Sequence, residues 1–261
     1  MENVTLFKDE VVNIFITGGT TGIGLELAIA YLKDGHRVGI CARDLTKFPE
    51  EIKKKFKLLK TYQLDVTDRE SLKQAVRDFA GPEEILDIMI ANAGRSVGNK
   101  TKLPDFKAAR DIVSINIVGV LNAFDVACEL MIPKNQGHLV ATSSVAGMVG
   151  LPGAAAYSAS KAYVTTLCES FALDLEKFGI NVTAIMPGFV DTPLTKKNNH
   201  KMPFMMGADR AAILIKKAIE EKKAVFIFPL PMKIVMTLFK IMPRRLYRKL
   251  MKLKIFNYSK N

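Results

Sequence analysis

The feature that most constrains the fold is a regular alternation of short apolar runs with longer amphipathic stretches, from residue 11 to about residue 228. The short runs are rich in β-branched residues, as strands are, and the longer stretches carry apolar residues at helical spacing. The run at 85–91 is apolar almost throughout, so it needs cover on both faces. The pattern therefore predicts an α/β protein with a doubly wound parallel sheet of about seven strands and helices on both faces.

The strands can be placed individually, and helical stretches separate them. We predict strands at residues 11–17, 37–41, 60–64, 85–91, 138–142, 181–186 and 224–228. No repeat, linker or low-complexity segment interrupts residues 1–221. We therefore expect one domain over 1–229, followed by a C-terminal helical extension over 230–261.

The N-terminus and the cysteines bear on the cellular compartment. The first ten residues carry acids and no long apolar run, so we expect no secretory signal. Cys41, Cys128 and Cys168 are widely scattered, which favours a reducing compartment over a disulfide framework. No Cys/His spacing suggests a metal site. We expect a cytoplasmic protein.

A glycine-rich turn follows the first strand and leads into a helical stretch at 25–32. Its glycines are Gly18, Gly19, Gly22 and Gly24. Glycines let the backbone turn sharply and approach a pyrophosphate, whose charge a helix N-terminus stabilises. The spacing is GxxxGxG rather than the commoner GxGxxG, so an ordinary strand-to-helix turn is the alternative interpretation.

The end of the second strand indicates which dinucleotide would bind. In dinucleotide-binding folds an acid there grips the adenosine ribose hydroxyls and disfavours a 2′-phosphate. This chain has Ala42 and Arg43 at about that place. The planar guanidinium of Arg43 can pair with a 2′-phosphate, which favours NADP over NAD. A solvated surface arginine is the alternative.

Tyr157 and Lys161 lie four residues apart at the start of a predicted helix, so they project from one face. A free tyrosine has a pKa of ~10, and an adjacent ammonium lowers it toward neutrality, where the phenol can transfer a proton. Exposed helices carry such pairs by chance. Further motifs have to support this one.

That support comes from a combination of motifs that resembles the short-chain dehydrogenase/reductase (SDR) family over about residues 11–228. The segment from Thr17 to Gly24 resembles the TGxxxGxG cofactor motif of the family, and Tyr157 to Lys161 resembles its YxxxK motif. Asn116 lies in a segment similar to the family's Nxxg helix. Ser144 lies 13 residues before Tyr157, as the family's catalytic serine does.

The resemblance implies a Rossmann-type fold, the NADP-preferring branch of the family, and NADP(H) as the cofactor. Further matches are an NAG motif at 92–94, an acid-aliphatic pair at 65–66 and a PG motif at 187–188 with a following threonine. By this resemblance residues 1–229 form a dinucleotide-binding catalytic domain. Its implied cofactor-binding residues are Gly18, Thr20, Thr21, Gly22, Ile23, Gly24, Arg43, Asp65, Val66, Asn92, Ala93, Gly94, Tyr157, Lys161, Pro187, Gly188, Val190 and Thr192.

Four residues receive catalytic roles from the resemblance. Tyr157 gives or takes the proton on the substrate oxygen, and Ser144 hydrogen-bonds that oxygen as charge develops. Lys161 holds the nicotinamide ribose and lowers the pKa of the tyrosine, and Asn116 holds a water that continues the proton relay. Ser143 is an alternative to Ser144, or else a strand-end hydroxyl bonded to the backbone.

We therefore expect an NADP(H)-dependent oxidoreductase that interconverts a carbonyl and an alcohol on a hydrophobic or lipid-like substrate, as a homo-oligomer. The alternatives are a non-catalytic dinucleotide-binding sensor or scaffold, and a family-related epimerase or dehydratase. The family builds its substrate lid in the segment at 192–207, which here contains Met202, Phe204, Met205 and Met206. These side chains suit a bulky apolar substrate, or they pack in the core.

The last forty residues carry almost the whole net charge of +12, because residues 222–261 hold 11 Lys or Arg and no acid. Lys233, Thr237 and Lys240 form only a narrow polar stripe on a helix over 231–242, which predicts burial of its other flanks. Residues 243–253 place bases on one arc and apolar residues on the other, as in a helix at an anionic membrane surface. Packing on the chain's own domain or on a second subunit is the alternative. We do not expect nucleic-acid binding, because nothing aromatic is interleaved with the bases as a platform on which nucleobases could stack.

Overall fold

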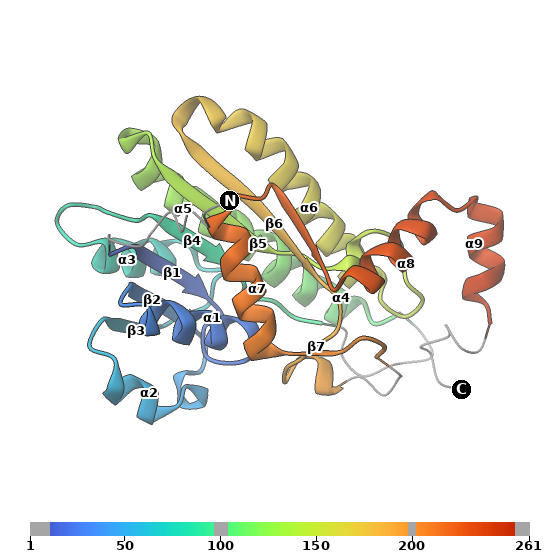
Figure 1. The fold of residues 1–261 in the computed structure, drawn as a ribbon, viewed down its shortest axis with the longest axis horizontal. Helices are drawn as coiled ribbons and strands as arrows, with labels where there is room; N and C mark the ends of the chain where they lie inside the picture. The colour runs from blue at the N-terminus through green and yellow to red at the C-terminus, as the bar shows by residue number, and fades with distance from the viewer. Residues whose placement is uncertain (1–10, 97–103, 198–201, 254–261) are drawn as a thin grey trace, which may run out of the picture.

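The computed structural model describes residues 11–96, 104–197 and 202–253. Its centre is a parallel seven-stranded sheet with the order β3-β2-β1-β4-β5-β6-β9 (Figure 1). This confirms the predicted doubly wound sheet, and each predicted strand lies within a few residues of an observed one. The strands are β1 (Asn13–Thr17), β2 (Arg37–Ala42), β3 (Leu59–Gln63), β4 (Ile88–Ala91), β5 (Gly137–Thr142), β6 (Ile180–Pro187) and β9 (Val225–Phe228).

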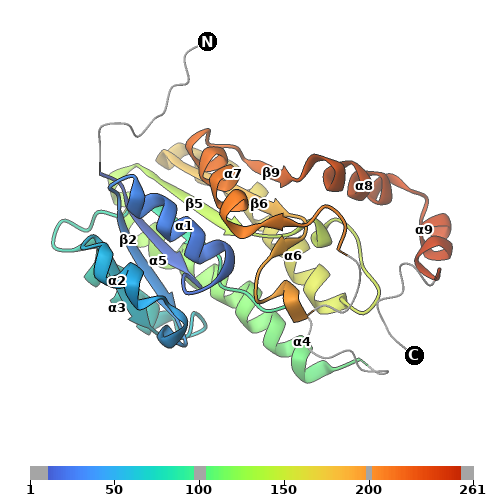
Figure 2. The ribbon, with the colours of Figure 1, turned by 60° about the horizontal axis from the view of Figure 1, so that its bottom comes forward.

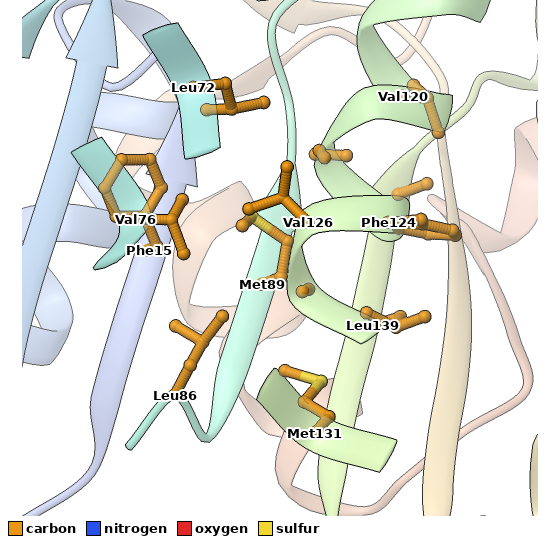
Figure 3. Packing of buried hydrophobic residues seen from close by; sticks show 14 of the residues in the cluster. Phe15, Leu72, Val76, Leu86, Met89, Val120, Phe124, Val126, Met131 and Leu139 are labelled. Carbon is orange, nitrogen blue, oxygen red and sulfur yellow. The ribbon is translucent and has the colours of Figure 1, made fainter. Parts of the chain in front are cut away.

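Helices cover both faces of the sheet because successive strand residues point to opposite sides. Ile14 and Ile16 of β1 pack with α1 (Gly22–Lys33) and α7 (Ala208–Glu220). Phe15, between them, packs on the opposite face with α3 (Arg69–Ala80), α5 (Gly119–Met131) and α6 (Ala155–Asp174), as Figure 3 shows for part of this cluster. Two further α-helices are α2 (Glu50–Lys55) and α4 (Phe106–Val113).

A π-helical turn, Ser114–Val118, joins α4 to α5 in one helical run, Phe106–Lys134. By length and composition this run could cross a membrane, but 56% of its most apolar window is buried inside the protein. α5 contributes Val120, Phe124 and Met131 to the core shown in Figure 3. This packing is that of a core helix in a doubly wound sheet.

The extension forms two helices, α8 (Leu230–Ile241) and α9 (Arg244–Met251), which lie at one end of the molecule beyond β9 (Figures 1 and 2). One side of each helix is buried in a third apolar cluster, through Met232, Met236, Tyr247 and Met251. The prediction that α8 is buried on its remaining flanks is wrong, because an apolar stripe on its opposite side is exposed. The predicted boundary at residue 229 stays a prediction.

Candidate active site

A cleft of about 410 Å³ lies at the carboxyl ends of the strands, where the strand order reverses between β1 and β4. Open parallel sheets bind ligands at this place, since loops from neighbouring strands diverge there. The structure brings the predicted site residues together around this one cleft. All of them line it except Gly24 and Asn116.

The glycine turn forms the floor of the cleft, which Gly18 and Gly22 line. Gly18 and Gly22 have φ of +68° and +57°, which favours glycine. A Cβ on Gly24 would lie 2.3 Å from the Gly18 carbonyl oxygen, and one on Gly18 would lie 2.8 Å from Cα of Ala93. The turn is therefore packed so tightly against neighbouring backbone that only glycine fits at these two positions, which fixes its shape at the start of the helix.

The N-terminus of α1 opens on this turn. Thr21 stands at the N-cap, and its side chain makes no capping hydrogen bond. The first amide groups of the helix thus lack a side-chain acceptor there and can bind an anion. Together with the glycine floor, this is a fit for the pyrophosphate of a dinucleotide.

Thr17 and Asn92 hold the turn against the next strand. The Thr17 hydroxyl oxygen accepts hydrogen bonds from the amides of Asn92 and Ala93, both at 3.0 Å. The side-chain amide of Asn92 (Nδ2) donates to the backbone carbonyl oxygens of Thr17 at 3.2 Å and Gly18 at 3.0 Å. The NAG segment therefore fixes the shape of the cofactor turn.

Two bases stand at the far end of the cleft. Arg43, whose side chain is 65% exposed, has Nη1 3.9 Å from Oδ2 of Asp65. Lys47, which the sequence analysis missed, lines the same end, with Nζ 3.2 Å from Oδ2 of Asp44. Lys47 belongs to a 3₁₀ turn, Leu45–Lys47, capped by Asp44. A short turn after β2 was the signal that could have placed it beside Arg43.

Ser144 and Tyr157 meet on one wall of the cleft. Ser144 follows β5, where its hydroxyl accepts from the Ala146 amide at 3.1 Å and donates to the Pro187 carbonyl oxygen at 3.4 Å. Tyr157 lies in the first turn of α6. Burial raises the pKa of the Tyr157 phenol, and a hydrogen bond with Ser144 offsets part of that rise.

Lys161 lies one helical turn after Tyr157, with its ammonium buried. Its Nζ donates to the Thr142 carbonyl oxygen at 2.6 Å, and burial lowers the pKa of this lysine to about 8. The lowering of the Tyr157 pKa by Lys161 stays a prediction. The ammonium lies 5.8 Å from the tyrosine ring centroid, and the effect of burial on the phenol dominates.

The structure decides the role of Ser143 and restricts that of Asn116. The Ser143 hydroxyl donates to the Lys161 carbonyl oxygen at 2.7 Å, so Ser143 is a strand-end hydroxyl bonded to the backbone and not an alternative to Ser144.

The side-chain amide of Asn116 donates to the Arg95 carbonyl oxygen and to Oγ of Ser160, both at 3.0 Å. Both amide hydrogens are thereby used. The water-holding role of Asn116 stays a prediction and would have to use another atom, such as a carbonyl in the π-helical turn.

The segment of the predicted lid begins and ends at a small parallel pair, β7 (Val190–Asp191) and β8 (Met206–Gly207). Phe204 and Met205 are about half exposed, so the alternative interpretation that they pack in the core is wrong for these two residues. Met206 packs partly against the core. Residues 198–201 lie outside the described residues.

Comparison with known proteins agrees with the geometry. A family model described as short chain dehydrogenase matches residues 12–203. An uncharacterized oxidoreductase of Myxococcus xanthus is 34% identical over 235 residues, which cover 89% of this chain and 93% of that protein. The 3-oxoacyl-[acyl-carrier-protein] reductase FabG of Thermotoga maritima is 31% identical over 188 residues, covering 70% and 75%. A structure of ElxO with NADP bound has a TM-score of 0.74 at 25% identity, covering 84% and 97%.

Proposed function

Since the chain belongs to the short-chain dehydrogenase family of oxidoreductases, we propose that it is an NADP(H)-dependent enzyme that interconverts a carbonyl and an alcohol on an apolar, lipid-like substrate. The observation that carries the proposal is the convergence of Ser144, Tyr157 and Lys161 beside the glycine floor of one cleft. A non-catalytic sensor has no chemical need for this group of side chains.

The bound nicotinamide supplies or accepts the hydride. Tyr157, whose raised pKa keeps the phenol protonated near neutral pH, donates its proton to the substrate oxygen during carbonyl reduction. Ser144 donates a hydrogen bond to the same oxygen and stabilises the charge that develops on it. Lys161, which lines the same cleft, would hold the nicotinamide ribose when the cofactor is bound.

The preference for NADP(H) is supported by Arg43 and Lys47, two bases at the adenosine end of the cleft. A 2′-phosphate between them would gain charge-assisted hydrogen bonds and would compete with Asp65 and Asp44 for these cations. ElxO, at 25% identity, was solved with NADP bound. NADH carries a neutral 2′-hydroxyl at this place and offers these bases no charged group.

The proposal of an apolar substrate is supported by exposed apolar side chains in the segment where this family builds its substrate lid. Phe204 and Met205 expose apolar surface on the segment after the PG motif. Relatives named 3-oxoacyl-[acyl-carrier-protein] reductase make a 3-oxoacyl thioester one chemical class to test.

The test is NADPH oxidation against a panel of a long-chain ketone, a small ketone, a steroid ketone and a 3-oxoacyl thioester. Tyr157→Phe should lower turnover by at least ~10²-fold with NADPH binding retained, since one general acid is lost. Tyr163→Phe is the matched control, because this exposed tyrosine lies on the same helix. Parental turnover in Tyr157→Phe, or no reduction of any carbonyl by a protein that binds NADPH, would refute the proposal.

A further inference from the structure

The two C-terminal helices present a surface made of two kinds of side chain. On α8 the exposed residues Leu230, Ile234, Leu238 and Ile241 recur at helical spacing and form one stripe. They are 66%, 53%, 53% and 72% exposed. The stripe points away from the side that buries Met232 and Met236. The stripe is therefore a row of apolar side chains that face away from the protein core.

Bases flank this stripe and continue onto α9. Lys233 and Lys240 lie beside it on α8, and the outer arc of α9 carries Arg244, Arg245, Arg248, Lys249 and Lys252. All seven are exposed, and none forms an ion pair within the described residues. The sequence from 222 to 261 contains no acid that could neutralise them. We call these bases and the α8 stripe the extension surface.

The inner side of the helices fixes the extension surface to the active-site wall. Met232, Met236, Tyr247 and Met251 pack with Val145 and Val149, which follow Ser144. The Tyr247 hydroxyl donates to the Gly150 carbonyl oxygen at 2.6 Å. A Cβ on Gly188, which lines the cleft, would lie 3.1 Å from Cγ of Met232. These contacts hold the surface at one end of the cleft. Figures 1 and 2 show its two helices at one end of the molecule.

We propose that the extension surface docks the protein on an anionic lipid bilayer and thereby places this end of the cleft against the membrane. A bilayer satisfies both halves of the surface at once: headgroups bind the bases, and the acyl boundary accepts the aliphatic stripe. Docking itself is independent of the proposed reductase activity. Entry of a lipid-like substrate from the membrane rests on that proposed function.

Charge argues against a second copy of the chain as the occupant. A twofold dimer through this surface would bring its seven bases toward the same seven of the second copy, and residues 222–261 supply no acid to offset them. Nucleic acid would be expected to meet exposed aromatic side chains among the bases. Here Phe239 is half-buried and Tyr247 is buried, both on the packed side.

The test is co-sedimentation of the full chain with phosphatidylcholine vesicles and with vesicles containing a quarter phosphatidylglycerol, at low and high salt. We expect binding to the anionic vesicles that weakens as salt rises. Arg244→Gln, Arg248→Gln and Lys252→Gln combined should weaken it about 100-fold, because each base contributes about fivefold, or ~1 kcal/mol. The control is Lys53→Gln, Lys54→Gln and Lys57→Gln, which removes the same charge from exposed residues remote in sequence.

The apolar stripe has its own pair of variants. Leu238→Ser with Ile241→Ser should weaken vesicle binding at least tenfold and leave the turnover of a water-soluble carbonyl unchanged. Leu173→Ser with Ile213→Ser, at exposed apolar residues of α6 and α7, should change neither. Circular dichroism and thermal melts confirm that each variant folds. Vesicle binding needs no turnover, so its failure is distinguishable from a failure of the reductase assay.

Three results would overturn the proposal. The first is no binding to anionic vesicles at low salt. The second is equal weakening by the control variants, which would indicate a general charge effect. The third is a dimer in analytical ultracentrifugation that the Leu238→Ser, Ile241→Ser variant dissociates while vesicle binding is unaffected, which would assign the stripe to a second copy.

Discussion

Replacing Lys161 by methionine should stabilise the protein while weakening the active site. Burial lowers the pKa of the Lys161 ammonium from its ordinary 10.5 to about 8. At pH 7 the charged ammonium therefore lowers the stability of the folded protein by about 3 kcal/mol. The substitution removes this penalty. It also leaves the Thr142 carbonyl oxygen without its donor, which costs about 1–2 kcal/mol. The free energy of unfolding should therefore rise by about 1–2 kcal/mol at pH 7, or ~2–4 °C in Tm for each kcal/mol.

The sign of the pH dependence makes this prediction specific. Between pH 8 and 10.5 the unfolded parent binds more protons than the folded parent, so its stability rises with pH across that window. Lys161→Met lacks this rise. Urea unfolding of both proteins from pH 7 to pH 10.5 should show the advantage of the variant shrinking steadily, while its affinity for NADPH is reduced. A variant less stable than the parent at pH 7, or a difference independent of pH, would refute the reasoning.

Three further predictions concern the cofactor end and the core. Arg43→Ala and Lys47→Ala should each weaken NADPH binding at least tenfold and leave NADH binding unchanged, as titration by cofactor fluorescence would show. Gly24→Ala should abolish binding of both cofactors and lower Tm, because its Cβ would lie 2.3 Å from a carbonyl oxygen; Gly150→Ala, whose Cβ meets nothing within 4 Å, is the control. Burial lowers the pKa of His138 to about 4, so the unfolded chain binds more protons between pH 6.5 and 4. The free energy of unfolding should fall by about 3 kcal/mol as pH drops through that window, and His138→Gln should flatten this fall in urea titrations.

The sheet and the cleft could be predicted from sequence because both depend on local patterns. A strand buried on both faces is apolar throughout, as at Ile88 to Ala91, and its position follows from that run alone. Parallel strands then bring their carboxyl ends to one edge. Residues that follow different strands, such as Gly18, Asn92 and Ser144, must therefore meet although they are far apart in the chain.

Properties set by contacts between distant segments could not be predicted in this way. The pKa of Tyr157 depends on how deeply α6 is buried and on where the Lys161 ammonium points, and the i, i+4 spacing fixes neither. Lys47 lines the cleft from a 3₁₀ turn capped by Asp44. An acid directly after a strand signals such a turn, but it does not show that the turn lies at the cleft.

The extension shows how one pattern can have two structural outcomes. An apolar helix with a narrow polar stripe is expected to be buried on its other flanks, because water disfavours that much apolar surface. In α8 only the side carrying Met232 and Met236 meets the protein, and the side carrying Ile234 and Leu238 does not. The interior of the domain is already filled by α1, α7 and the sheet on one face and by α3, α5 and α6 on the other. The second apolar flank of α8 is covered neither by water, which disfavours it, nor by the protein's own core. We propose that an apolar phase covers it, and the adjoining bases favour an anionic bilayer.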